Sequence, residues 1–133
     1  MFNPLIFRLV MNIFTSNFAK AKSLDSSKFL VVAISRYVPK GYSGVRELRF
    51  APSRKLLMSY KNGLSTHDYE EIFFSELGNP DSVYSVFCDL AKLSNGRDIV
   101  LCCYEKAGEF CHRRLIADFV FSHWHYDIKE LFS

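Results

Sequence analysis

The chain has 133 residues, of which 49% are hydrophobic and 23% are charged, close to the average of a globular domain. This composition excludes extensive disorder and a coiled coil, and the length corresponds to one domain with a core of its own. The net charge of +3, from 17 basic and 14 acidic residues, is too small to indicate nucleic-acid binding by itself. The four cysteines lack the spacing of a disulfide scaffold, so we expect reduced thiols and a cytoplasmic protein.

The chain begins with an apolar stretch, residues 1–18. Arg8 interrupts it and Pro4 lies near its start, so it is a poor membrane span, and it lacks a clear signal cleavage site. A buried strand after an apolar leader fits the stretch better, and Met11 could begin a chain of its own. We therefore expect residues 1–10 to be an N-terminal extension, residues 11–133 to form a single α/β domain, and no membrane partner.

Three β-prone runs predict strands at residues 13–15, 29–34 and 99–103. The second and third runs are continuously apolar, a pattern typical of parallel strands that are covered on both faces. We expect a small Rossmann-like α/β sandwich, in which a mainly parallel sheet is flanked by helices. The tail from His125 onward could add an edge strand.

The spacing of apolar residues predicts four helices, one from residue 52 to about 61, one from 65 to 78, one from 79 to 95 and one starting near 110. Ser65 and Asp68 resemble a capping box, and Asn79 followed by Pro80 is a typical helix start. Residues 36–50 have neither helical nor strand periodicity, which predicts a long loop.

Ligands of an open parallel sheet bind beyond the carboxyl ends of the strands, so the residues after each strand are site candidates. These candidates are Ser16 after the first strand, Arg36 and Tyr37 after the second, Tyr104, Glu105 and Lys106 after the third, and Cys111, His112 and Arg113 at the start of the last helix. The three cations, together with the positive end of the helix, favour a phosphate-bearing ligand.

Helical geometry sorts the charged residues of the last helix. At about 100° per residue, His112 falls on the buried stripe, Arg113 on its flank and Arg114 on the opposite side. We expect His112 to face the sheet and Glu105, Arg113 to reach the site, and Arg114 to lie in solvent.

Each of these candidates also has a purely structural interpretation. His112 could be a satisfied buried histidine with Glu105 as its ion-pair partner, and Tyr104 could be a core residue instead of a stacking face for a base. Cys111 could be a small apolar filler. A thiol at a helix N-terminus has a lowered pKa, however, so Cys111 is also a candidate nucleophile.

A metal site is disfavoured because the sequence has neither a CxxC nor an HxxxH pair. We therefore expect no metal and no cofactor. The residues that could in principle ligate zinc are Cys103, Cys111, His112, His123 and His125.

The segment from Ile99 to Val120 resembles the signature of the domain-of-unknown-function family 488, in which a strand is followed by Cys-x-Glu-Lys, a short spacer, Cys-His-Arg and a helix. The matching residues are Cys103, Glu105, Lys106, Cys111, His112 and Arg113. The similarity extends from about residue 11 to about 122. It implies a compact Rossmann-like α/β sandwich of a prokaryotic or phage branch, with no established activity and a suspected link to nucleotides or nucleic acids. The chain departs from the family in residues 1–10 and at Phe110, where many members have histidine.

Three functions fit these residues. The first is an enzyme acting on a nucleotide-like substrate, with Glu105 and His112 as acid and base. The second is a pocket that sequesters a phosphorylated signalling nucleotide without turnover, as a phage protein could do. The third is a nucleic-acid-binding module on the long basic loop, with Tyr37, Tyr42 and Phe50 for stacking. The partner expected most is an anionic, nucleotide-like ligand at the C-terminal edge of the sheet.

Overall fold

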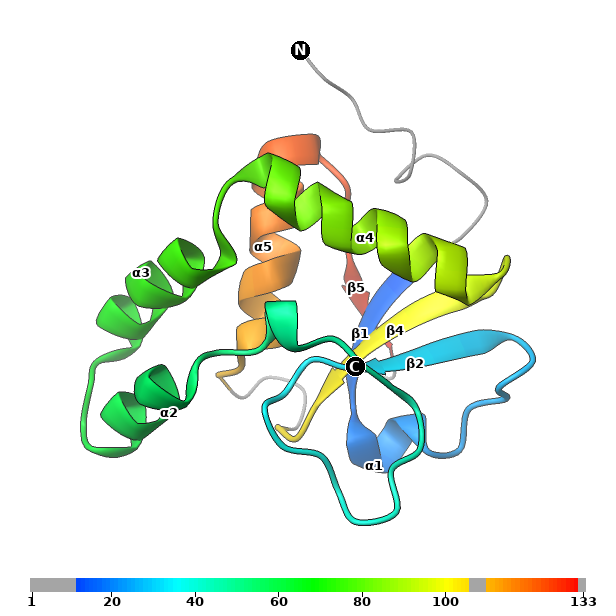
Figure 1. Ribbon diagram of the computed structural model, residues 1–133, viewed down its shortest axis with the longest axis horizontal. Coiled ribbons are helices and arrows are strands. Elements are labelled where there is room, and N and C mark those ends of the chain that lie inside the picture. The colour runs from blue at the N-terminus through cyan, green and yellow to red at the C-terminus, as the bar shows by residue number, and fades with distance from the viewer. Residues whose placement is uncertain (1–11, 106–109, 132–133) are drawn as a thin grey trace.

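In the part of the chain that the structure describes, five parallel strands form the central sheet (Figure 1). The computed structural model describes residues 12–105 and 110–131. The strands are β1 (Ile13–Asn17), β2 (Phe29–Ala33), β3 (Val45–Arg46), β4 (Asp98–Cys103) and β5 (Lys129–Glu130). They lie in the order β3-β2-β4-β1-β5, and every pair is parallel. The prediction of a mainly parallel α/β sheet is confirmed, and β5 is the edge strand that the tail predicted.

The helices follow local signals that the sequence carries. They are α1 (Phe18–Ala21), the 3-10 helix η2 (Leu48–Phe50), α2 (Arg54–Lys61), α3 (Thr66–Leu77), α4 (Pro80–Ser94) and α5 (His112–Trp124). Ser53, Ser65 and Asn79 cap α2, α3 and α4, each accepting a hydrogen bond from a backbone N–H three residues later. Because these signals act over only a few residues, the three predicted helix starts agree with the structure.

The two faces of the sheet are covered unequally. The large core lies on the face where α2 to α5 pack, and alternate strand residues such as Val32, Ile99 and Leu101 point into it. Among the described residues, the opposite face is covered by α1, by the loop after β2 and by Leu131, through Phe18 and Tyr42 among others. The uniformly apolar strands thus have apolar neighbours on both faces. Within the described ranges, the cluster on the α1 face is the smaller of the two.

One structural expectation is wrong: residues 36–50 are not an uninterrupted loop. Val45 and Arg46 pair with Val32 and Ala33 to form β3, and the η2 turn buries Phe50 in the core. A strand of two residues is too short to show a periodic pattern in the sequence. It forms because its backbone pairs with the neighbouring strand β2.

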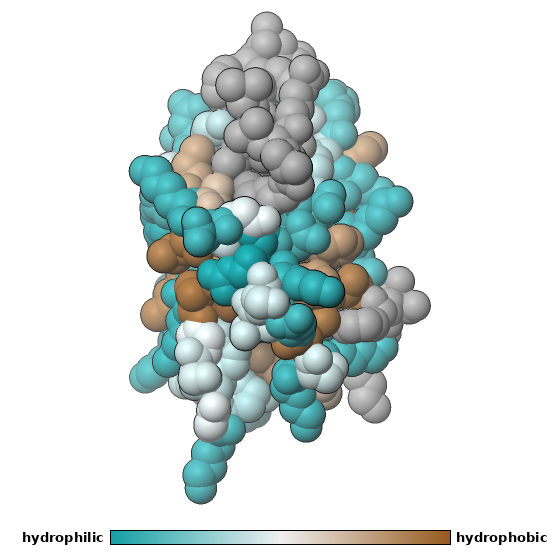
Figure 2. Space-filling model, turned by 90° about the vertical axis from the view of Figure 1, so that its right-hand side faces the viewer, coloured by the Kyte–Doolittle hydropathy of each residue, from teal (hydrophilic) through white to brown (hydrophobic). Residues whose placement is uncertain are grey.

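Residues 1–10, expected to be an extension, lie outside the described residues. Within residues 12–105 and 110–131, no helix is long and apolar enough to cross a membrane. On the side of the molecule that Figure 2 shows, hydrophobic residues form small patches separated by hydrophilic side chains.

Candidate functional site

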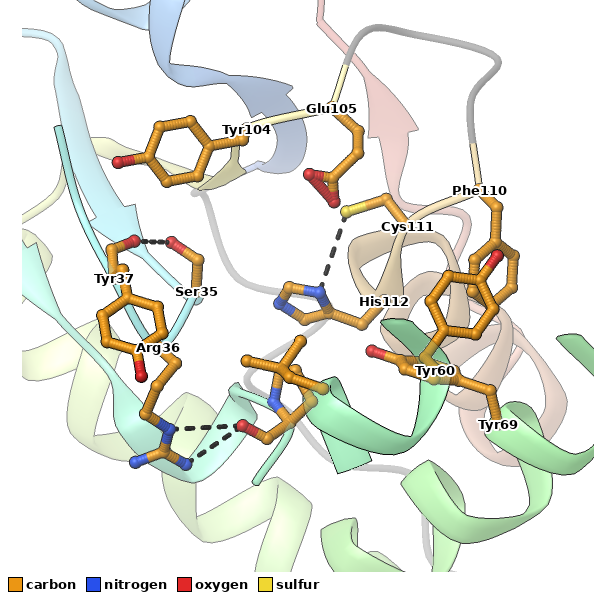
Figure 3. A pocket seen from close by; sticks show the side chains of 12 residues that line it. Ser35, Arg36, Tyr37, Tyr60, Tyr69, Tyr104, Glu105, Phe110, Cys111 and His112 are labelled. Atoms are coloured by element: carbon orange, nitrogen blue, oxygen red, sulfur yellow. Dashed lines mark hydrogen bonds between the residues drawn. The ribbon is translucent and has the colours of Figure 1, made fainter. Parts of the chain in front are cut away.

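A cavity of about 170 Å³ opens at the C-terminal edge of the sheet, beyond the ends of β2 and β4 (Figure 3). Its lining comes from the segments after these strands, from the start of α5 and from α2 and α3. The lining residues are Ser35, Arg36, Tyr37, Pro52, Leu57, Tyr60, Tyr69, Tyr104, Glu105, Phe110, Cys111 and His112. Six of the predicted site residues therefore meet, namely Arg36, Tyr37, Tyr104, Glu105, Cys111 and His112.

Aromatic rings make up much of the cavity wall. Tyr60, Tyr69 and Phe110 pack against one another with ring centroids 5.1–5.4 Å apart. Tyr37 and Tyr104 lie closer to solvent and are 54% and 50% exposed. Tyr60 and Tyr69 were not among the predicted site residues. No local signal could have identified them, because the folding of α2 and α3 against the sheet edge brings them there.

His112 lies at the centre of the cavity lining, buried as its helical phase predicted. Its Nε2 atom is 2.5 Å from the carbonyl oxygen of Ile34, so Nε2 carries the proton and donates it. Burial lowers the pKa of His112 to about 4; the hydrogen bond to Ile34 opposes this shift and the charge of Arg113 adds to it. His112 is therefore a neutral ring near pH 7, and its Nδ1 lone pair lies 3.8 Å from the sulfur of Cys111.

Of the residues that the structure describes, Arg36 is the arginine or lysine that lines the cavity. Its Nε and Nη2 atoms both donate to the carbonyl oxygen of Pro52, at 3.2 Å each. Arg46 in turn donates to the backbone oxygen of Arg36 at 2.9 Å. The guanidinium has five N–H groups, so it can be held at the wall by Pro52 and still offer donors to an anion.

Arg113 does not line the cavity, contrary to the expectation that it would reach the ligand. Its side chain is buried, and it forms a bidentate ion pair with Glu130 of β5, with N–O distances of 3.0 and 3.1 Å. Its Nη1 donates to the backbone oxygen of Glu105 and to the sulfur of Cys103. Helical phase located Arg113 correctly on the flank of the buried stripe, but it could not reveal a partner on β5. Arg114 lies in solvent, as expected.

Ser16, another predicted ligand-binding residue, does not line the cavity. Ser16 is fully buried in β1, and its hydroxyl donates to the backbone oxygen of Leu131, on the β5 side of the sheet. Lys106 lies outside the described residues. The ends of β2 and β4 thus supply the site, whereas β1 contributes to a neighbouring polar cluster around Glu130.

Cys103 and Cys111 form a disulfide, so the expectation of reduced cysteines is wrong for this pair. Their Cα atoms are 7.7 Å apart. Cys111 therefore has no thiolate in this form, and the structure does not support it as a nucleophile. The pairing is a tertiary event, since it joins the end of β4 to the N-cap of α5. Cys88 and Cys102 are free.

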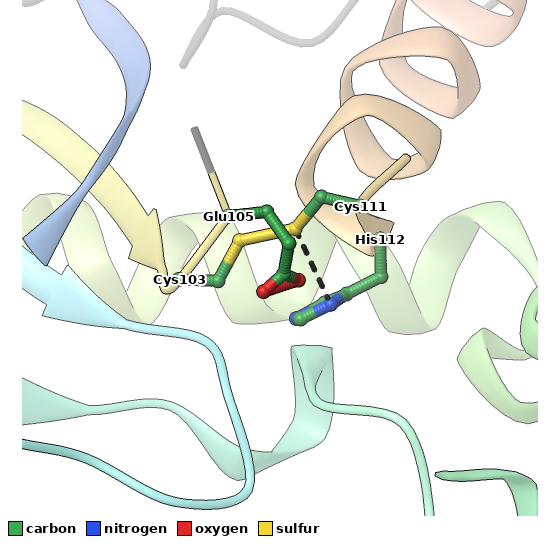
Figure 4. A group of neighbouring side chains, drawn as sticks. All are labelled: Cys103, Glu105, Cys111 and His112. Carbon is green, nitrogen blue, oxygen red and sulfur yellow. Dashed lines mark hydrogen bonds between the residues drawn. A yellow bond between two sulfur atoms is a disulfide. The ribbon is translucent and has the colours of Figure 1, made fainter. Parts of the chain in front are cut away.

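The disulfide lies beside two other polar side chains (Figure 4). Single donor atoms of Cys103, Glu105, Cys111 and His112 all lie within 4.8 Å of one another. His123 and His125, which the sequence also offered as metal ligands, are at the other end of α5, about 16 Å along the helix axis.

Comparison with known proteins agrees with the signature of the segment around β4 and α5. A family model described as the active DUF488-N3 subclade, DUF488-N3a, matches residues 15–123. No curated protein and no solved structure matches the chain. The matched segment contains the whole sheet apart from the first strand residues and β5, and it contains every cavity residue. The chain therefore belongs to the DUF488 family.

Proposed function

We propose that the cavity binds a phosphorylated, nucleotide-like small molecule. The observation that carries this proposal is a wall of aromatic rings next to the guanidinium of Arg36 and the start of α5. Aromatic faces suit a planar base, while arginine and a helix N-terminus suit phosphate oxygens. The cavity of about 170 Å³ is smaller than the roughly 300–1,000 Å³ of most ligand pockets. It accommodates a base or a sugar, so the phosphate would lie at the mouth.

A reaction on the bound molecule is the second part of the proposal. The matching subclade is described as active, which favours turnover over sequestration. Glu105 is the acid–base candidate, because it lines the cavity and its carboxylate faces the ring of His112. His112 itself is neutral and suits positioning better than proton donation. In this proposal the sheet presents its ligand as Rossmann-like sheets do, and the protein works in the cytoplasm.

The nucleic-acid alternative is less well supported by the loop after β2. Arg46 donates to a backbone carbonyl, and Arg49 pairs with Glu47 at 2.7 Å and Asp89 at 3.0 Å. Phe50 is in the core and therefore cannot stack on a base. Because Arg49 is held in ion pairs and Phe50 is buried, a small ligand is the better proposal.

Isothermal titration calorimetry with a panel of nucleosides, their mono- and diphosphates, and inorganic phosphate tests the binding proposal. We expect a phosphorylated compound to bind more tightly than its nucleoside. Arg36→Gln should weaken that binding by about tenfold or more, as expected for loss of a charge-assisted hydrogen bond, while Arg36→Lys retains part of it. Arg114→Gln, an exposed arginine away from the cavity, is the matched control and should bind normally.

Two results would contradict the binding proposal: no heat from any phosphorylated compound, or equal losses in Arg36→Gln and Arg114→Gln. Turnover is tested separately by incubating the tightest ligand with the protein and separating the products by chromatography. Product that forms with the wild-type chain but not with Glu105→Gln supports catalysis. An unchanged ligand would assign the cavity to sequestration.

A further inference from the structure

The four side chains beside the cavity that Figure 4 shows are donors of the kind that transition-metal ions bind. Cys103 ends β4, Glu105 follows it, and Cys111 and His112 begin α5. One sulfur, oxygen or nitrogen atom from each lies within 4.8 Å of the other three. We propose that, when the two cysteines are reduced, these four side chains bind one zinc-type divalent cation.

The donor set and the spacing both suit such an ion. Thiolate, imidazole and carboxylate are the protein ligands of tetrahedral zinc, at about 2.3 Å for sulfur and about 2.0–2.2 Å for nitrogen and oxygen. A tetrahedral ion holds its two sulfur atoms about 3.8 Å apart, so it can bind only after the disulfide has opened. The Cα atoms are 7.7 Å apart, wider than in most disulfides, so the two residues can admit an ion between their sulfurs with little backbone movement.

The hydrogen bonds around the cluster prepare two of these ligands. His112 donates its Nε2 proton to the carbonyl oxygen of Ile34, which leaves the Nδ1 lone pair directed at the cluster. Ligating histidines generally donate their other ring N–H to such an acceptor, which fixes the ring orientation. Arg113 donates from Nη1 to the sulfur of Cys103 at 3.0 Å. A guanidinium at this distance stabilises a thiolate at that sulfur.

Burial gives the cluster a closed and an open side. Cys103, Cys111 and His112 are all buried, whereas Glu105 is partly exposed at the cavity. An ion at this point would have three enclosed ligands and a fourth, Glu105, on the cavity side. The inference does not depend on the proposed nucleotide ligand, because the ion alone is the probe in the test below.

Opening the disulfide requires an external reductant, and in this proposal the reductant is a dithiol. The disulfide takes two electrons and two protons from the dithiol, which becomes a disulfide itself, and Cys103 and Cys111 become thiols. The cation then replaces the two thiol protons, which pass to solvent, and binds the two thiolates. Exchange with an oxidised dithiol would reverse the reduction and release the cation.

The test uses the full chain, reduced with a dithiol and freed of it by gel filtration without oxygen. Titration with Co²⁺ should give a thiolate-to-cobalt charge-transfer band and the visible bands of a tetrahedral site, both saturating at one ion per chain. Zn²⁺ should then displace the cobalt and remove the bands. The oxidised protein, in which no thiolate is available at this place, should give neither band.

Variants identify the ligands. Cys103→Ser should weaken Co²⁺ binding by about 100-fold or more, because even an outer-shell change costs 10–100-fold in metal affinity. Glu105→Gln, a partly exposed position that leaves the core intact, should keep the charge-transfer band but weaken binding by about tenfold. Cys88→Ser, which removes a free cysteine elsewhere, and His67→Ala, in an exposed cluster without sulfur, are the controls and should bind normally.

Each outcome decides the proposal, with circular dichroism confirming that every variant is folded. Co²⁺ binding that is about 100-fold weaker in Cys103→Ser, together with weakened binding in Glu105→Gln, supports it. Absence of a charge-transfer band in the reduced wild-type chain overturns it, as does normal binding by Glu105→Gln and Cys103→Ser. Loss of the band in Cys88→Ser would assign the ion to another place. Failure here would leave the nucleotide proposal standing, since that titration contains no metal.

Discussion

Arg113 and Arg114 are neighbours in the sequence with opposite environments. Arg113 has a side chain that is only 3% exposed and pairs with Glu130, whereas Arg114 is 53% exposed beside Asp118. We predict that Arg113→Met lowers the free energy of unfolding by about 3–5 kcal/mol, because it leaves the carboxylate of Glu130 without its cation. Arg114→Met should change it by less than about 0.5 kcal/mol. Urea denaturation of both variants in the same redox state measures the difference.

A double variant checks the cause of that loss. Adding Glu130→Gln to Arg113→Met removes the uncompensated charge, so part of the lost stability should return. Equal destabilisation by Arg113→Met and Arg114→Met would show that the pair with Glu130 contributes little.

Tyr42 should make the protein less stable as the pH rises through the alkaline range. Its hydroxyl donates to the carbonyl oxygen of Val45 at 2.7 Å, and burial raises the pKa of Tyr42 from 10.0 to about 12, with the charge of Cys102 adding to the shift. The folded state therefore keeps the phenol proton after the unfolded state has lost it. The resulting stabilisation is complete below pH 10 and disappears as the pH rises towards 12.

We predict that Tyr42→Phe lowers the free energy of unfolding by about 1 kcal/mol at pH 8, because the variant lacks this hydrogen bond. Between about pH 10 and 12 the difference from wild type should shrink, because phenylalanine has no proton to lose. Urea denaturation at pH 8 and at pH 11 gives both values. A constant difference at the two pH values would contradict the raised pKa of Tyr42.

At the scale of elements, α2 and α3 form one wall of the cavity, and a hydrogen-bonded contact joins them. Ser53 caps α2 by accepting from Leu56 N–H, and its backbone N–H and hydroxyl both bind the carboxylate of Glu76 in α3. Among the described residues, the hydroxyl of Ser65 accepts only from the Asp68 N–H of its own helix, α3. Ser53 therefore caps α2 and also connects it to α3, whereas Ser65 acts within α3.

We predict that Ser65→Ala costs about 1 kcal/mol of unfolding free energy, as the loss of a simple N-cap does, and that Ser53→Ala costs about 2 kcal/mol. Thermal or urea unfolding of the two single variants compares them. A loss in Glu76→Gln equal to the difference between the two serine variants would attribute that excess to the helix–helix contact. Equal losses for the two serines would show that this contact adds nothing.

At the scale of the whole molecule, the described residues close a core that extends from Ile13 in β1 to Ile128 before β5. The domain assignment of residues 11–133, with residues 1–10 as an extension, stays a prediction. Because the core of the described residues already includes Ile13 of β1, we expect a chain lacking residues 1–10 to unfold in one cooperative transition. A thermal melt followed by circular dichroism, with the full chain as reference, measures this. A broad transition without a midpoint would show that the first ten residues are part of the core.

About half of the cavity lining could be predicted from the sequence. The apolar runs of β2 and β4 indicated parallel strands, and parallel strands bring their carboxyl ends to one edge. That reasoning located Arg36, Tyr104 and Glu105, and helical phase located His112. It could not locate residues such as Tyr60, because no rule for a single element says which face of a later helix will border the cavity.

The sequence by itself determined the class of the fold, the helix starts and the strands of the centre, because apolar runs and capping residues act through neighbours in the chain. Only the tertiary structure decided the partners of the charged and sulfur-bearing side chains. Arg113 has a side chain suited to binding phosphate but forms an ion pair with Glu130. Cys103 forms a disulfide with Cys111. Charge and thiol chemistry are compatible with many partners, so the choice among them depends on which distant elements the packing of the sheet brings within contact.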